Sequence, residues 1–236
     1  MPDRSAMHSP DAPARGESRS ARSHLTIVLA TSNPGKLREL QQLLRGLPVS
    51  LISASAVLGE SLEVVEDGET FEANARKKAH AVCEATRMVA LADDSGLEVD
   101  ALGGRPGVHS ARFAHPNATD EENNRVLLEQ LESHRRHAPT ARFRCVLAMA
   151  SPWDERHWTS EGACPGRITE SPRGSGGFGY DPLFVPDELD GRTLAEVTAE
   201  EKNRISHRFR AAEAMIPNLV ELVNRRLEET EAIAGE

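Results

Sequence analysis

The sequence lacks long apolar runs and contains few cysteines. No run approaches the roughly 20 residues of a membrane-spanning helix, and the first residues lack the apolar core of a signal peptide. The three cysteines, Cys83, Cys145 and Cys164, are widely separated and form no Cys-x-x-Cys pair. This spacing argues against a disulfide framework or a zinc knuckle. We therefore expect a soluble, cytoplasmic protein with buried thiols.

Positive charge is also in deficit. Lys and Arg number 28 against 37 Asp and Glu, so the net charge is −9, which disfavours nonspecific binding to nucleic acid. Any anionic substrate must therefore be met by cations that are placed locally. The 236 residues, 39% of them hydrophobic, are enough to bury a core as one domain or as two closely joined lobes.

Apolar runs and helical patterns alternate along the chain, which predicts an α/β fold. Residues 1–23 have no apolar periodicity and are predicted to be a disordered extension before a single domain, 24–236. Strands are expected at 25–30, 49–52, 88–92, 97–102, 142–150 and 156–168, and helices at 36–45, 70–86, from Thr119 onward, and at 206–229 with a break before Pro217. The last two strands should pair antiparallel because their connection is short, which makes the sheet mixed.

Two adjacent carboxylates, Asp93 and Asp94, directly follow the predicted strand 88–92. Charges at the end of a buried strand are costly unless a cation or hydrogen-bond donors meet them. Ligands of α/β folds also bind at strand ends. A metal and general-base site would explain the pair. Asp, Ser and Gly are equally ordinary turn residues, so the pair alone leaves both interpretations open.

A second motif leads from the first strand into a helix. It consists of Thr31, Ser32, Asn33, Pro34, Gly35 and Lys36. Hydroxyl and amide side chains at a helix N-terminus, with a lysine beside them, favour phosphate binding. The Gly-x-x-x-x-Gly-Lys-Ser/Thr spacing of a P-loop is absent. The alternative is an ordinary capped turn with Asn33 or Ser32 as the cap.

A glycine-rich stretch, 174–182, contains Phe178 and the only tyrosine, Tyr180. Glycines let the backbone approach a ligand, and aromatic faces can stack on a base. Aromatic residues make up only 4% of the chain, so two of them in this stretch favour ligand binding over core packing. A long hairpin loop is the alternative.

Two charged stretches complete the set of candidates. Residues 200–208 include a lysine, a serine, a histidine and an arginine that could bind phosphates and a purine carbonyl, or simply form a solvated helix face. Residues 66–74 supply carboxylates that could help to hold a cation, although most should be acids at a helix start. Together the motifs provide what a magnesium-dependent nucleotide hydrolase needs.

The combination of motifs resembles the inosine/xanthosine triphosphate pyrophosphatases. The motifs that carry the resemblance are 31–36, 69–75, 92–97, 103–112, 176–182 and 205–208, in family order. The resemblance implies an elongated mixed β-sheet with flanking helices, two lobes around a central nucleotide cleft, and a homodimer. It also implies Mg²⁺-dependent hydrolysis of ITP, dITP and XTP to the monophosphate and pyrophosphate.

The resemblance also implies roles for individual residues. Asp94 matches the general base and metal ligand, and residues 31–36 match the triphosphate-binding loop. Some relatives carry a further metal-binding glutamate just before the Gly68 position. Here Glu66 and Asp93 are the further candidate ligands, Glu66 only if Val65 does not occupy that place. The residues that match substrate contacts are Ser95, Phe178, Gly179, Tyr180, Asp181, Lys202, His207 and Arg208.

Two alternatives stay open at the level of sequence. One is a Maf-type nucleotide pyrophosphatase that acts on other or modified bases. The other is a nucleotide-binding regulatory protein that has kept the pocket without turnover, against which the intact Lys36, Asp94 and Lys202 argue. No nucleic-acid or membrane partner is expected.

Overall fold

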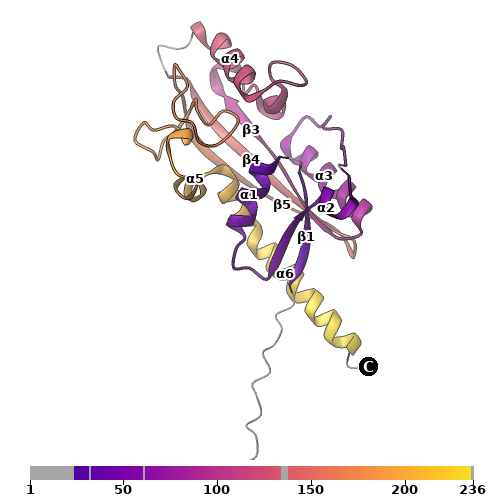
Figure 1. Ribbon diagram of the computed structural model, residues 1–236. Coiled ribbons are helices and arrows are strands. Elements are labelled where there is room, and N and C mark those ends of the chain that lie inside the picture. Colours follow the sequence, from indigo (N-terminus) through magenta and orange to yellow (C-terminus); the bar gives the residue numbers. More distant parts are fainter. Residues whose placement is uncertain (1–23, 32, 61, 134–137, 235–236) are drawn as a thin grey trace, which may run out of the picture.

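The computed structural model describes residues 24–31, 33–60, 62–133 and 138–234, so the predicted extension 1–23 and Ser32 lie outside the described residues. Within these ranges the chain forms a mixed sheet in the order β2-β1-β3-β4-β5-β6 (Figure 1). β1 pairs parallel with β2 and β3, and the other pairs are antiparallel. The strands are β1 (Leu25–Ala30), β2 (Val49–Ser53), β3 (Val89–Val99), β4 (Thr140–Ser151), β5 (Asp154–Ile168) and β6 (Phe184–Pro186). The predicted mixed α/β fold is confirmed.

Three helices begin directly after a capping threonine. Thr70, Thr119 and Thr198 each accept a backbone N–H at a helix start, as expected of N-cap residues. The helices are α1 (Pro34–Leu43), α2 (Ala54–Leu58), α3 (Phe71–Thr86), α4 (Asp120–Gln130), α5 (Ala199–Ile205) and α6 (His207–Ala234), with 3₁₀ turns at Asp100–Leu102, Gly107–Arg112 and Leu194–Glu196. None of these described helices is both long and apolar enough to span a bilayer.

Three apolar cores stabilise the sheet. Alternate side chains of β1 and β3 point to opposite faces, so α1 and α6 pack on one face and α2 and α3 on the other. The far ends of β3, β4 and β5 form a third core with α4 and the segment around β6. The long strands therefore connect two packed ends of the molecule. Cys83, Cys145 and Cys164 are buried and unpaired, as predicted.

The aspartate pair lies inside a strand rather than at its end. The sequence predicted a strand at 88–92, a junction at the aspartates and a second strand at 97–102, but β3 runs without interruption from Val89 to Val99. β4 pairs with it throughout and satisfies the backbone. Gly96 is not a turn residue: an added Cβ would lie 2.4 Å from the Gly107 carbonyl, which packs against the strand. The expected junction is therefore wrong.

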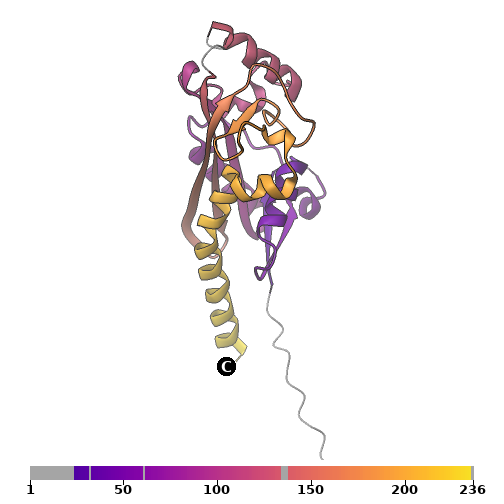
Figure 2. The same ribbon diagram turned by 90° about the vertical axis from the view of Figure 1, so that its left-hand side faces the viewer.

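The predicted break in the last helix is also wrong. Figure 2 shows α6 as one continuous helix, with Pro217 inside it. Proline removes the N–H that would bond to the carbonyl of Glu213, four residues earlier. Glu213 and Pro217 are both on the exposed side, so water can solvate that carbonyl. Met215 and Leu219 pack into the core on the other side and hold the helix together.

We expect the contact between β5 and α6 to tolerate no side chain at Gly162. A Cβ there would lie 2.3 Å from the His207 carbonyl oxygen and 2.4 Å from the Ala211 nitrogen. Gly162→Ala should therefore lower the free energy of unfolding by about 1–3 kcal/mol, the usual cost of overpacking. Urea unfolding measures this change, with Ala163→Ser on the opposite face of β5 as the control. An unchanged unfolding midpoint in Gly162→Ala would contradict the packing described.

Candidate active site

Asp93 is a buried carboxylate surrounded by donors. It is 1% exposed, and four side chains donate to its two oxygens, which uses the full acceptor capacity of a carboxylate. Burial alone would raise the pKa of Asp93, but Arg208 and Lys36 outweigh it and hold the pKa well below its usual value. The donors are Arg208 Nε at 2.8 Å, Ser95 Oγ at 2.9 Å, Cys145 Sγ at 3.1 Å and Lys36 Nζ. Asp93 is thus ionised and has no lone pair left for a metal.

Asp94 points to the opposite face of β3, toward α3. Lys78 Nζ donates to its Oδ1 at 2.7 Å, while Oδ2 is buried and has no hydrogen-bond partner among the described residues. Burial raises the pKa of Asp94 to about 6, although Lys78 opposes the rise. A carboxylate that titrates near neutral pH and keeps one oxygen unpaired has the properties of a general base.

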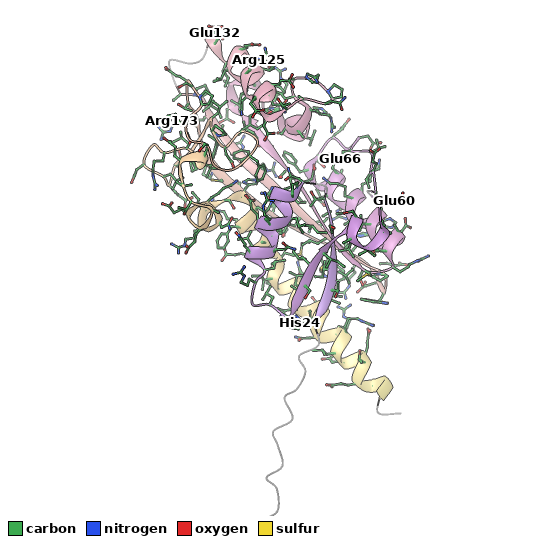
Figure 3. All side chains as sticks on the ribbon, viewed as in Figure 1. His24, Glu60, Glu66, Arg125, Glu132 and Arg173 are labelled. Carbon is green, nitrogen blue, oxygen red and sulfur yellow. The ribbon has the colours of Figure 1, made fainter. Side chains whose placement is uncertain are left out.

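Glu66, rather than Val65, lies beside Asp94 in the structure. Lys78 Nζ lies 3.2 Å from Glu66 Oε2, and Glu66 is close enough to Asp94 to contribute to its raised pKa. Val65 is 71% exposed and points away. Figure 3 labels Glu66 in the segment that leads to α3. Two carboxylates, Glu66 and Asp94, therefore lie side by side on one lysine.

The loop before α1 is a capped turn whose lysine points into the site. Asn33 Oδ1 accepts the N–H groups of Gly35 at 2.8 Å and Lys36 at 3.2 Å, so these two groups are not free for a phosphate. The capped-turn interpretation is correct in this respect. Asn33 and the Lys36 side chain nevertheless line a cavity beside Asp93.

The basic stretch is not a solvated helix face. Lys202 is 5% exposed and Arg208 is 1% exposed, and both contact Glu39 of α1, with Lys202 Nζ at 2.9 Å. Burial would raise the pKa of Glu39, but Arg208 and Lys202 lower it further than burial raises it. Lys202 Nζ also donates to Asp181 at 2.6 Å. The carboxylates therefore fix both cations in place.

A cavity of about 120 Å³ lies next to this network. It is lined by Lys36, Ser95, Phe178, Tyr180, Lys202 and His207, among others. Lys202 Nζ lies 4.4 Å from the centre of the Phe178 ring, a cation–π distance. The Tyr180 hydroxyl donates to the Ser110 carbonyl at 2.9 Å, so Tyr180 is a buried wall rather than a free aromatic face. The glycine-rich stretch lies in the long loop between the antiparallel strands β5 and β6. The alternative interpretation of this stretch, a long hairpin loop, is therefore also correct.

His207 lines the same cavity in a neutral form. Its ring stacks on Phe143, with centroids 4.8 Å apart, and burial together with Arg208 holds its pKa well below the usual value. Its Nδ1 is buried and has no partner within the described part of the chain. A neutral imidazole with one unpaired nitrogen can hydrogen-bond to an uncharged ligand.

These side chains meet where β1 ends. The last pair between β1 and β3 joins Ala30 to Ala92, so Asp93 and Asp94 lie just beyond the carboxyl end of β1, where ligands of parallel sheets bind. The site therefore lies at the end of a strand, as expected, but that strand is β1 and not β3. We name the cavity beside Phe178 and Tyr180 the aromatic cavity. Asp94 does not line it, because Asp94 faces α3.

The sequence analysis missed two charged residues of the site. In each case the position of the residue on its helix could have identified it. Glu39 follows Lys36 by three residues on α1, so both lie on one helix face. Lys78 falls within the buried stripe of α3 formed by Phe71, Asn74, Ala75, Ala79 and Val82. A lysine is seldom buried unless a carboxylate is paired with it, so a lysine at a core position predicts a buried acid nearby.

Comparison with known proteins places this site in a family. A model of the Ham1 family matches residues 27–218. The chain belongs to the Ham1 family. The solved structure of a HAM1 protein from Coxiella burnetii superimposes with a TM-score of 0.74 at 42% identity, covering 84% of this chain and 99% of that one.

Curated Ham1 relatives carry an enzymatic name. A dITP/XTP pyrophosphatase of Geobacter sulfurreducens is 53% identical over 78% of this chain and 92% of its own length. One from Bacillus subtilis is 47% identical over 77% of this chain and 90% of its own length. The predicted resemblance and the prediction of an enzyme, a hydrolase acting on acid anhydrides, are confirmed. The Maf-type alternative loses its support because the matched model is that of the Ham1 family.

We expect Lys78→Met to raise the pKa of Asp94 above 6. Lys78 is the cation that opposes the effect of burial, so removing its charge further disfavours the ionised carboxylate. An NMR titration of the aspartate carboxyl carbons of the ligand-free protein measures the shift. Lys77→Met is the matched control, because Lys77 pairs with the exposed Asp67 instead. A pKa of Asp94 that stays the same or falls in Lys78→Met would contradict this electrostatic account.

Proposed function

We propose that this protein hydrolyses the non-canonical purine nucleotides ITP, dITP and XTP to the monophosphate and pyrophosphate, with Mg²⁺ as cofactor, and so cleanses the nucleotide pool. The names of its curated relatives support the substrate class. The observation that carries the proposal is the pair on β3, in which Asp94 has a raised pKa and an unpaired oxygen while Asp93 holds two cations. A homodimer and a cytoplasmic location stay predictions.

The proposed reaction begins with proton abstraction from water. Asp94 accepts the proton through its unpaired Oδ2 and orients the water toward the α-phosphorus. Lys78 keeps Asp94 partly ionised and in place. Attack at the α-phosphorus breaks the bond to the β-phosphate, so the products are a nucleoside monophosphate and pyrophosphate.

The residues around Asp94 fit a magnesium ion. Carboxylate oxygens are its preferred protein ligands, and Mg²⁺ is usually held by one or two carboxylates together with substrate phosphates. Asp94 and Glu66 supply such a pair, and no group of three or more acidic, histidine or cysteine ligands is arranged for a metal in the described ranges. When bound, Mg²⁺ would polarise the phosphoryl oxygens and offset the charge of the leaving pyrophosphate.

The charge balance of the site also favours a cofactor cation. Among the described residues, the cations of its ion-pair network are Lys36, Lys78, Lys202 and Arg208, and their carboxylate partners are Glu39, Glu66, Asp93, Asp94 and Asp181. The carboxylates outnumber the cations by one. A triphosphate would therefore add negative charge to a cluster that has no positive excess, unless a divalent cation enters with it.

We assign base selectivity to the segment 206–208, which is part of the stretch 200–208 that could bind a purine carbonyl. The guanidinium nitrogens of Arg208 already donate to Asp93, Glu39 and Ser95. The neutral His207 in the cavity keeps an unpaired Nδ1. In the tautomer with a proton on Nδ1, His207 donates to the 6-carbonyl of hypoxanthine or xanthine. The 6-amino group of adenine cannot accept that bond, and such a polar mismatch can discriminate by roughly 10⁴-fold.

A substrate profile tests the proposed function. The purified protein is incubated with ITP, dITP, XTP, ATP, GTP, UTP or CTP, in the presence of Mg²⁺ or of a chelator, and pyrophosphate is measured. We expect pyrophosphate from the first three nucleotides only, and only with Mg²⁺. Turnover of UTP or CTP in preference to ITP would support a Maf-type activity, and no turnover with bound nucleotide would indicate a regulatory protein.

We expect Asp94→Asn to lose at least about 10²-fold in kcat for ITP, the usual scale for the loss of a general base. Binding of ITP should persist, because the cations that bind phosphate are anchored by other carboxylates. Steady-state kinetics and equilibrium binding separate the two effects. Asp67→Asn, which changes an exposed aspartate of the neighbouring segment, is the control. A kcat near that of the wild type in Asp94→Asn would exclude Asp94 as the base.

A further inference from the structure

One helix holds both polar backbone atoms of Gly179, in the wall of the aromatic cavity. The Gly179 N–H donates to Asp120 Oδ2 at 2.6 Å, and Asn124 Nδ2 donates to the Gly179 carbonyl at 3.0 Å. Asp120 and Asn124 are one turn apart on α4 and therefore share a face. In Figures 1 and 2, α4 lies next to the loop between β5 and β6. We name these two contacts the α4 clamp.

Gly179 has little else to hold it in place. Its φ is +62°, and among the described residues no atom other than those of Gly179 and its chain neighbours lies within 4 Å of the position that a Cβ would occupy. Glycine at positive φ has wide conformational freedom. Hydrogen bonds rather than packing must therefore fix this residue. The neighbouring Phe178 N–H is held separately, by Asp181 Oδ2 at 2.9 Å.

The position of Gly179 matters because both of its neighbours line the cavity. Phe178 lies in a narrow gap: a Cβ on Gly35 would come within 2.9 Å of its ring, and Lys202 covers the ring face. Tyr180, on the other side of Gly179, lines the same cavity. A shift of the Gly179 peptide would therefore act mainly on Phe178, because Tyr180 is also held by its hydroxyl and by its carbonyl.

We propose that Asp120 and Asn124 are positioning residues for purine recognition, acting through the Gly179 peptide. This inference rests on the proposed function. Asn124 does not line the cavity, whereas Asp120 does. An effect of Asn124 on substrate therefore passes through Gly179, and Asn124→Ala is the variant that isolates positioning. The cations Lys36 and Arg208 line the same cavity, but Asp93 and Glu39 hold them in place, and neither carboxylate belongs to α4. The α4 clamp therefore governs affinity for the base and leaves affinity for the phosphates unchanged.

Two variants test the clamp independently. Asn124→Ala and Asp120→Ala each remove one bond to Gly179 and should each raise KM for ITP about 10-fold, the effect of losing one hydrogen bond of ordinary to charge-assisted strength. The kcat should stay within about 2-fold, as expected when binding alone is lost. Asn124→Ala should fold, because its side chain also carries a buried oxygen without a partner among the described residues.

Three comparisons separate positioning from a general structural effect. Inorganic pyrophosphate, which has no base, should inhibit the wild type and both variants with the same inhibition constant. Asp120→Asn keeps an acceptor oxygen and should restore KM to within about 2-fold of the wild type. Glu121→Ala, which removes the neighbouring exposed first-turn acid of α4, should leave KM unchanged.

An unchanged KM in both alanine variants would overturn the inference. So would a loss of pyrophosphate affinity that parallels the loss of ITP affinity, or a failure of Asp120→Asn to restore KM. If the wild type released no pyrophosphate from ITP, the proposed function itself would fail instead, so the two failures are distinguishable. If Asp120→Ala did not fold, Asn124→Ala would still decide the question.

Discussion

The buried charge of Asp93 is the constraint on which the rest of the site depends. An isolated carboxylate in the centre of a sheet would cost several kcal/mol, and the cost falls only if cations and donors surround it. Lys36 comes from α1, Arg208 from the first turn of α6 and Cys145 from β4. Segments from both ends of the described chain therefore have to converge on β3. Glu39 continues this network to Lys202 and so to the aromatic cavity.

Asp94 differs from Asp93 only in the side of the strand that it faces. On one face two cations hold the pKa of Asp93 well below its usual value, whereas on the other burial prevails over the single Lys78 and raises the pKa of Asp94 to about 6. Two neighbouring carboxylates are thereby divided into a permanent anion and a proton acceptor. Environments that push apart the pKa values of paired acids are a recurring way to assign catalytic roles.

Local sequence patterns, namely the alternating apolar runs and the helical patterns, predicted most of the helices and strands. Where the predictions were wrong, in β3 and α6, contacts between distant segments determine the structure. The motifs 31–36, 92–97, 176–182 and 205–208 contain many of the residues that the structure brings together around Asp93 and the cavity. The uninterrupted β3 depends on pairing with β4, some 50 residues away, and α6 continues past Pro217 because its apolar face is buried. Glu39 and Lys78 occupy helix positions that their local patterns mark as facing the core or Lys36, but the partners that give them a role lie on distant segments.

The central claim is that water activated by Asp94 attacks the α-phosphorus. Hydrolysis of ITP in water enriched in ¹⁸O, followed by mass spectrometry of both products, tests it directly. The account predicts one ¹⁸O atom in the nucleoside monophosphate and none in pyrophosphate. Label in pyrophosphate would place the attack at the β-phosphorus, and release of labelled inorganic phosphate would place it at the γ-phosphorus. Either result would contradict the geometry proposed for Asp94.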